Sequence, residues 1–480
     1  MEKKSIKKNY IYQVSYQILS IIVPFITTPY VSRVLGPAGV GTYSYSNSIA
    51  SYFVLVASLG LATFGQREVA YYQEDLQRRS QAFWEVVVLK TMTSLLALGA
   101  YISFLFIIKQ NNIVFYIYCL NIIGNLFDIS WYFQGMENFQ IIVIRNMIFK
   151  IVNIAYIFCF IKTEADLPFY VFGICGFNVI NAISLWPILY GRIVWTQDIH
   201  PFKNIRAVIE LFAPTVAFQI YAVLDKTMIG LVDKSGVENG CYEQAEKIIL
   251  MAKMLFTSLS TVMLPRMASM LKSGQHKEVK HFLSKACGFD WILGAPVMMG
   301  LIAISDILVP LFLGPGFEKS VIILIILSPI IIVTSISGVI GYQYLIASGK
   351  QNIYTLTVFI SAGCNFIFNS FFIPRYLATG AALGSIFAET IIIIILVLYM
   401  QKQKVLNATD VFKYSLKPII ASIIMAIMLR FLKNYLPVTW VALFFMVACG
   451  AIIYAICLSL FKDELFLENV NIVFDKFKKR

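Results

Sequence analysis

The chain is dominated by long apolar runs that are separated by short polar breaks. Residues 321–333 and 391–400 are typical runs, and hydrophobic residues make up 59% of the 480 positions, whereas only 14% are charged. A stretch of about 20 apolar residues can cross a bilayer as a helix, and soluble domains carry about 25% charged residues. The pattern therefore excludes a water-soluble globule and predicts an all-α polytopic membrane protein.

Fourteen windows are apolar enough to be predicted as membrane spans. They cover roughly residues 10–32, 40–64, 83–107, 113–133, 141–161, 168–190, 207–232, 241–264, 286–312, 319–344, 353–373, 380–400, 411–431 and 437–460. No predicted outer connection exceeds about 15 residues, which leaves no room there for a catalytic domain. We therefore expect a protein that is not an enzyme.

The spans contain an internal repeat. The starts of the first six recur about 200 to 210 residues later, and Gly41 and Tyr43 match Gly240 and Tyr242 at one offset of 199 residues. An even number of spans per repeat gives parallel halves related by pseudo-twofold symmetry about the membrane normal. We predict two six-helix bundles, residues 1–200 and 201–405, followed by two extra helices and a basic tail in 406–480.

The formal charge of +13 comes from lysines and arginines that lie mostly at the ends of spans. They do not gather in one basic domain, so a nucleic-acid partner is not expected. With the N-terminus inside, the predicted inner connections hold most of these cations, as the positive-inside rule requires. Both termini are therefore predicted to be cytoplasmic.

Metal and cofactor chemistry has little support in the sequence. The eight cysteines are scattered singly, without metal-type spacing, and the three histidines all lie in polar connections. We expect no metal site and no cofactor.

Ionisable side chains inside predicted spans mark a candidate cavity, because such groups are costly in hydrocarbon. Glu246 and Lys253 are seven residues apart and share one helix face in the eighth span. Asp225 and Lys226 lie in the seventh span, at about the same predicted depth as Glu246 and Lys247. These groups suggest a charged layer, which Glu210 extends along the seventh span.

Polar residues also follow one face of the first two spans. Gln17 lies in span 1, Tyr43 and Asn47 lie in span 2, and the repeat offset superposes Asn47 on Glu246. A cavity lined by the first two helices of each half would keep these faces away from lipid. Internal ion pairs that only fix helix packing are the alternative. We favour that structural interpretation for Asp128 with Arg145 or Lys150, and we leave the role of Lys90 open.

Three segments resemble one known family. They are residues 33–43 (RVLGPAGVGTY), residues 131–137 (WYFQGME) and Leu264-Pro265-Arg266. The chain is similar along its whole length to the Wzx-type polysaccharide repeat-unit flippases of the multidrug/oligosaccharidyl-lipid/polysaccharide exporter superfamily. The resemblance implies transport of undecaprenyl-pyrophosphate-linked oligosaccharide from the inner to the outer leaflet of the bacterial plasma membrane. O-antigen, capsule or exopolysaccharide assembly is the implied process, and polysaccharide polymerases are implied partners.

Roles for the polar residues follow from that substrate. The basic groups suit a pyrophosphate and the polar and aromatic groups suit a sugar, while the polyprenyl tail stays in lipid. The carboxylates suit coupling to a proton or sodium gradient by alternating access. The predicted substrate-binding residues are Lys226, Lys247, Lys253, Gln17, Tyr43, Asn47, Tyr242 and Arg33, and the predicted coupling residues are Asp225, Glu246 and Glu210.

Other functions make different demands on the sequence. A cation-coupled multidrug antiporter of the same superfamily would have twelve spans and an acidic group in its first helix, whereas span 1 has none after Glu2. A lipid II flippase would carry an arginine cluster along span 1, where only Arg33 is present at the outer end. A glycan polymerase or glycosyltransferase would need a large catalytic loop.

Overall fold

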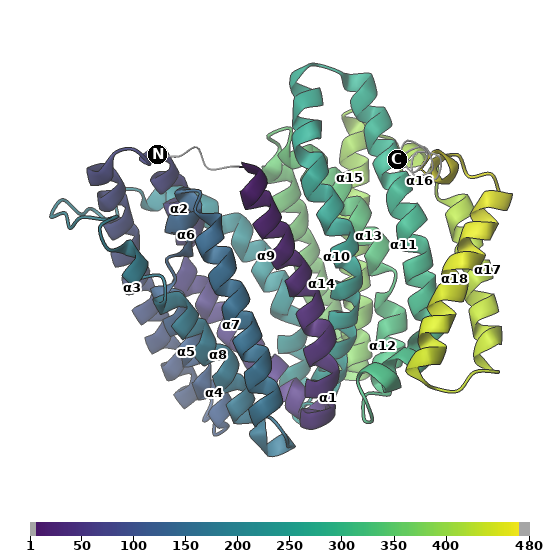
Figure 1. Ribbon diagram of the computed structural model, residues 1–480, viewed down its shortest axis with the longest axis horizontal. Coiled ribbons are helices and arrows are strands. Elements are labelled where there is room, and N and C mark those ends of the chain that lie inside the picture. The colour runs from purple at the N-terminus through teal and green to yellow at the C-terminus, as the bar shows by residue number, and fades with distance from the viewer. Residues whose placement is uncertain (1–5, 470–480) are drawn as a thin grey trace. The chain divides into compact units, whose positions relative to one another are not determined.

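The computed structural model describes residues 6–469, and this part of the chain folds into helices and contains no strand. Within it, ten stretches are long and apolar enough to cross a membrane. Figure 1 shows the helices along the chain. The prediction of an all-α polytopic membrane protein is confirmed. The basic residues at the extreme termini, among them Lys3, Lys4 and 478–480, lie outside the described residues.

Every predicted span lies in a helical region, and some of these regions contain more than one helix. One apolar stretch, Ser15–Tyr71, contains the first two spans. The seventh, eighth and thirteenth spans correspond to α9 (Ile205–Val232), α10 (Val237–Lys272) and α17 (Leu416–Lys433), which are not among the ten uniformly apolar stretches. These helices interrupt their apolar sequence with charged residues such as Asp225, Lys253 and Arg430.

The chain divides into two compact units, Met1–Gly240 and Cys241–Arg480. The first unit contains α1 (Ile6–Ser58), α2 (Leu61–Tyr71), α3 (Leu76–Ile107), α4 (Ile113–Ile117), α5 (Cys119–Phe127), α6 (Ser130–Gly135), α7 (Phe139–Phe160), η1 (Glu164–Asp166), α8 (Leu167–Ile183), η2 (Pro187–Leu189) and α9. The helix α10 contains the boundary between the two units, which lies between Gly240 and Cys241. The second unit continues with α11 (His276–Phe312), α12 (Lys319–Leu327), α13 (Ile330–Gly338), η3 (Val339–Ile346), α14 (Gln351–Tyr376), α15 (Ala378–Lys402), α16 (Ala408–Phe412), α17 and α18 (Trp440–Leu460). By contacts α9 therefore belongs to the first unit, although the predicted repeat begins at residue 201.

The fourth predicted span of each repeat is interrupted. In the first unit it is split into α4, α5 and α6, and in the second unit into α12, α13 and the π-helix η3. A break inside a membrane frees backbone groups that lipid cannot hydrogen-bond. In the first unit the Lys90 ammonium donates to the Asp128 carbonyl at 2.7 Å, and the Trp186 indole donates to the Phe127 carbonyl at 2.8 Å. Lys90 is buried, so its position at this break gives it a structural role.

Glycines set the close approach of α1 to the start of α10. α1 bends at Gly36, whose φ of 62° lies in the left-handed region. Just beyond, a Cβ on Gly41 would lie 1.7 Å from the Gly236 carbonyl oxygen, and one on Gly240 would lie 2.0 Å from the Pro37 carbonyl oxygen. The two backbones therefore touch where the sequence repeat places its matching glycines.

In the second unit, α11 packs against α16, α17 and α18. Lys280 at the start of α11 forms an ion pair with Asp410 of α16 at 2.8 Å, and the Ser284 hydroxyl donates to the Asp410 carbonyl. Partial burial alone would raise the pKa of Asp410. The hydrogen bonds from the Lys280 side chain and the Asn407 backbone, and the charges of Lys280 and Lys413, outweigh burial and leave this pKa below its ordinary value.

Replacing Gly41 by Ala tests the backbone contact. The added methyl group cannot fit without moving the backbone of residues 236–240, which should cost about 1–3 kcal/mol. We expect a lower thermal midpoint for the purified protein in detergent. Gly99→Ala on α3 is the control, because its Cβ would meet nothing within 4 Å, so its midpoint should stay level or rise. An unchanged midpoint for Gly41→Ala would contradict the close packing.

The ion pair of Asp410 predicts a pH dependence. Because folding lowers the pKa of this carboxyl, its contribution to stability is fully present above about pH 4, the ordinary range for aspartate, and is lost as the pH falls through the lowered value. Asp410→Asn should therefore lower the thermal midpoint at pH 7. The difference between the variant and the unmodified protein should shrink as the pH is lowered towards 3. A difference that is the same at every pH would show that the charge of Asp410 is not involved.

Candidate functional site

A polar pocket of about 440 Å³ lies inside the first unit. It is bordered by α1, α5, α7, α8, α9 and the break between α5 and α6. For a pocket in an apolar helical bundle its lining is unusually rich in amides. The polar residues that line it are Ser51, Asn121, Asn125, Asp128, Ser130, Arg145, Asn146, Asn178, Asn181 and Gln219.

Helical spacing explains how these amides come together. Asn121 and Asn125 are four residues apart on α5, and Asn178 and Asn181 are three apart on α8, so each pair shares one helix face. α5 and α8 pack directly against each other. The amides of Asn178 and Asn121 meet across this contact with an N to O distance of 3.4 Å.

A chain of hydrogen bonds fixes the one guanidinium in the pocket. Arg145 donates to the Ser130 hydroxyl at 3.1 Å, and Ser130 in turn donates to the Asp128 carboxylate. On its other side Arg145 donates from Nε and Nη2 to the Asn146 amide oxygen, at 3.2 and 2.8 Å. The Asn181 amide donates to the same oxygen at 3.2 Å. The network therefore joins α6, α7 and α8 and holds the arginine in place.

Three buried polar atoms of this pocket have no hydrogen-bond partner within the described part of the chain. They are Nη1 of Arg145, Nδ2 of Asn125 and Oδ1 of Asn181. An unmade hydrogen bond of a buried group costs about 1–3 kcal/mol. The residues that line the pocket thus include two donors and one acceptor, on three different helices, whose hydrogen bonds are unmade.

This site is not among those predicted from the sequence. Arg145 and Asp128 are predicted as a structural pair, and Ser130 connects them. The asparagines carry a readable signal, because they recur at spacings of three and four residues within apolar windows. The apolar pattern of the fourth span predicts one helix and hides the break that places Ser130 beside Arg145.

Several predicted site residues pack within the first unit. The Tyr43 ring lies against Tyr118 and Tyr170, with ring centroids 6.5 and 5.4 Å apart. Asn47 is half-buried, and so is Lys226, whose backbone carbonyl accepts a hydrogen bond from Asn239 at 2.8 Å.

Asp225 of α9 is buried. The adjacent turn of α9 is joined to α1 by a 3.0 Å hydrogen bond from the Thr227 hydroxyl to that of Ser48. Two predicted cavity helices, spans 2 and 7, are therefore in direct polar contact.

Three predicted residues of the first unit are exposed. They are Gln17 and Arg33 on α1 and Glu210 on α9. Glu210 forms an ion pair with Arg206, one turn earlier on the same helix, at 3.1 Å. An exposed pair of this kind contributes little to stability.

The predicted site residues of the second unit all lie on α10. The buried Tyr242 hydroxyl shares a 2.8 Å hydrogen bond with the Ser385 hydroxyl of α15. Lys247 forms an ion pair with Glu243 at 3.1 Å, and the Glu243 side chain is only 8% exposed. Glu246 and Lys253 are half-buried.

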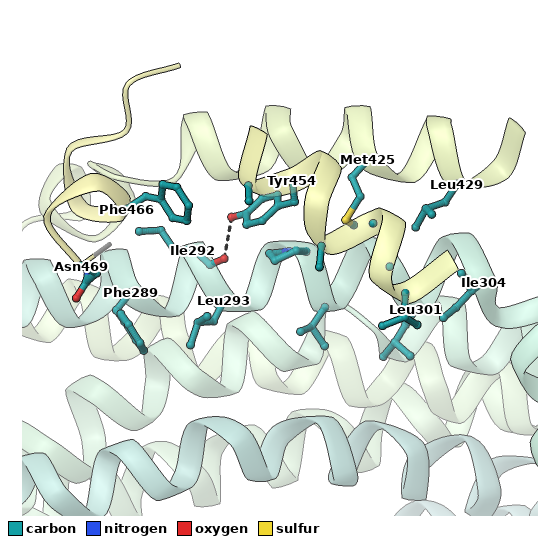
Figure 2. A pocket seen from close by; sticks show the side chains of 17 residues that line it. Phe289, Ile292, Leu293, Leu301, Ile304, Met425, Leu429, Tyr454, Phe466 and Asn469 are labelled. Atoms are coloured by element: carbon teal, nitrogen blue, oxygen red, sulfur yellow. Dashed lines mark hydrogen bonds between the residues drawn. The ribbon is translucent and has the colours of Figure 1, made fainter. Parts of the chain in front are cut away.

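The second unit also holds an apolar groove of about 810 Å³ between α11, α17 and α18 (Figure 2). Met425 and Leu429 face α11 from α17, and Phe466 and Asn469 close one end (Figure 2). The Tyr454 hydroxyl donates to the Ile292 carbonyl at 2.7 Å, which ties α18 to α11. The lining is almost entirely hydrocarbon and suits an alkyl or prenyl chain.

The family models and the sequence relatives that match this chain concern flippases and polysaccharide biosynthesis. The model described as polysaccharide biosynthesis protein matches residues 6–271, and that described as lipid II flippase MurJ matches residues 146–449. The "Putative O-antigen transporter" of Escherichia coli (strain K12) is 22% identical over 415 residues, covering 84% of this chain and 99% of the relative. The "Capsular polysaccharide biosynthesis protein CapF" of Staphylococcus aureus is 21% identical, covering 78% and 94%.

Solved structures with a similar fold include a lipid II flippase MurJ in an inward closed conformation. It aligns with a TM-score of 0.76 and 18% identity, over 95% of this chain and 99% of that one. An inward-facing multidrug resistance MATE family transporter aligns with a TM-score of 0.56 and 13% identity, over 80% and 98%. These likenesses describe the fold. The matches over more than half of the chain show that it belongs to the polysaccharide biosynthesis protein family, the Wzx-type members of the multidrug/oligosaccharidyl-lipid/polysaccharide exporter superfamily.

Proposed function

We propose that this multi-pass membrane protein is a flippase for lipid-linked oligosaccharide repeat units of a surface polysaccharide such as O-antigen or capsule. The observation that carries the proposal is the amide-lined pocket with its fixed arginine inside a membrane bundle of this family. Polar groups inside a membrane bundle are costly, and for this reason they mark functional sites.

The substrate we propose is an undecaprenyl-pyrophosphate-linked oligosaccharide, moved from the inner to the outer leaflet of the bacterial plasma membrane by alternating access. Such a molecule has a polar glycan, an anionic pyrophosphate and a long prenyl chain. The apolar groove of the second unit suits the prenyl chain. Both termini on the cytoplasmic side and a polysaccharide polymerase as partner are part of the same proposal.

Lys226, Lys247 and Lys253 remain the proposed contacts for the pyrophosphate. Lys253 is the strongest of them, because it is half-buried near the middle of α10, whereas Glu243 already pairs with Lys247. Among the proposed coupling carboxylates, Asp225 is buried and Glu210 is exposed. Burial favours Asp225 for a proton or sodium site, since a desolvated carboxylate gains most from binding a cation.

Lipid II transport is the second candidate, because the MurJ family model matches residues 146–449. The two substrates share the prenyl pyrophosphate and differ in their glycans, so one assay with both lipids separates them. The cation antiporter has less support, since α1 contains no acidic residue between Ile6 and Ser58.

Leaflet translocation in proteoliposomes tests the function. The intact protein should move a fluorescent undecaprenyl-pyrophosphate oligosaccharide, and Lys253→Ala should slow it by about tenfold or more, the cost of one lost charge-assisted hydrogen bond. Lys319→Ala, at the start of α12, serves as a matched lysine control. If the lipid stays in its leaflet while cationic drugs exchange for protons or sodium, the protein is an antiporter and the proposal is wrong.

The groove gives a separate prediction. Gly300 lines it, and a Cβ there would meet only the Met425 methyl, at 3.8 Å. Gly300→Leu should therefore fill the groove without displacing the backbone, and translocation of a long-chain substrate should fall more than that of a short-chain analogue. Equal rates for the variant and the intact protein on both chain lengths would show that the prenyl chain does not use this groove.

A further inference from the structure

We infer that the polar pocket of the first unit is a subsite for a sugar residue of the transported glycan, recognised through its uncharged hydroxyl and amide groups. This inference rests on the proposed function and adds the part of the substrate that the pocket holds. The pocket does not include any residue that the sequence had assigned to substrate.

The chemistry of the lining favours a sugar. An amide side chain presents a donor and an acceptor side by side, and a sugar hydroxyl is also both donor and acceptor. Six amide side chains line the pocket, from α5, α7, α8 and α9. The volume of about 440 Å³ lies in the range of small-molecule sites.

The charge of the pocket argues against the pyrophosphate as its occupant. Arg145 is the one cation among the lining residues, and Asp128 opposes it through the Ser130 hydroxyl. Asn146 already receives Nε and Nη2 of Arg145. Lys90 reaches the Asp128 carbonyl from outside the lining. Within the lining itself one positive and one negative side chain offset each other, which suits an uncharged polar ligand.

The three buried atoms without a hydrogen-bond partner define the contacts that a sugar would make in the pocket. Nη1 of Arg145 and Nδ2 of Asn125 would donate to sugar oxygens, and Oδ1 of Asn181 would accept from a hydroxyl. Arg145 and Asn181 are already oriented by Asn146, so the site is organised before the sugar arrives. A glycan with a polar group opposite each atom would be preferred over one without it.

The test uses synthetic undecaprenyl-pyrophosphate carriers that bear N-acetylglucosamine, glucose or galactose, each paired with its O-methylated analogue. Translocation is measured in proteoliposomes for the intact protein, Asn125→Leu and Asn181→Ala. Asn434→Ala, an exposed asparagine of the second unit, is the matched control. Thermal midpoints in detergent verify that each variant is folded.

We expect the intact protein to translocate at least one free sugar about tenfold faster than its O-methylated analogue, and each pocket variant to lose most of that preference. Asn434→Ala should keep it. If the folded variants keep the full preference, or slow both members of a pair equally, the pocket does not recognise the sugar and the inference is wrong. If the intact protein moves none of the carriers, the flippase function itself fails.

Discussion

Hydrocarbon cannot hydrogen-bond a polar group, and the structure of the first unit depends on this constraint. The break between α5 and α6 frees carbonyls, and Lys90 and Trp186 reach them from other helices. The same break brings Ser130 next to Arg145, so that the arginine is held between Asp128 and Asn146. One irregular turn of backbone thus requires a buried lysine and also creates the polar pocket.

Close backbone contact is the second organising feature. Gly41, Gly236 and Gly240 leave no space for a side chain where α1 meets the start of α10. Small residues are the usual means by which membrane helices approach each other, because lipid gives no hydrophobic drive for association. Gly41 and Gly240, on which the predicted repeat rests, are therefore also packing residues.

The charged residues of α9 and α10 have several local environments. Glu210 pairs with Arg206 at an exposed position, and Lys247 pairs with Glu243 in a partly buried one. Asp225 is buried beside α1, whereas Lys253 is half-buried. Charge in a membrane helix marks a place that avoids lipid, but the immediate neighbours decide whether it fixes packing or meets a substrate. For this reason Lys253 and Asp225 carry more of the proposed mechanism than Lys247 and Glu210.

The sequence by itself determined the membrane class and the helical fold, because the length of an apolar run reports directly on the bilayer it must cross. It also carried the family, through segments such as residues 33–43 and 131–137. Only the tertiary structure decided which polar side chains meet. Asn125, Arg145 and Asn181 lie on three helices, and their common pocket depends on how α5, α7 and α8 pack around a break that the apolar pattern conceals. Hydropathy measures how well a segment suits lipid, whereas a binding site depends on contacts between segments far apart in the chain, which no single helix encodes.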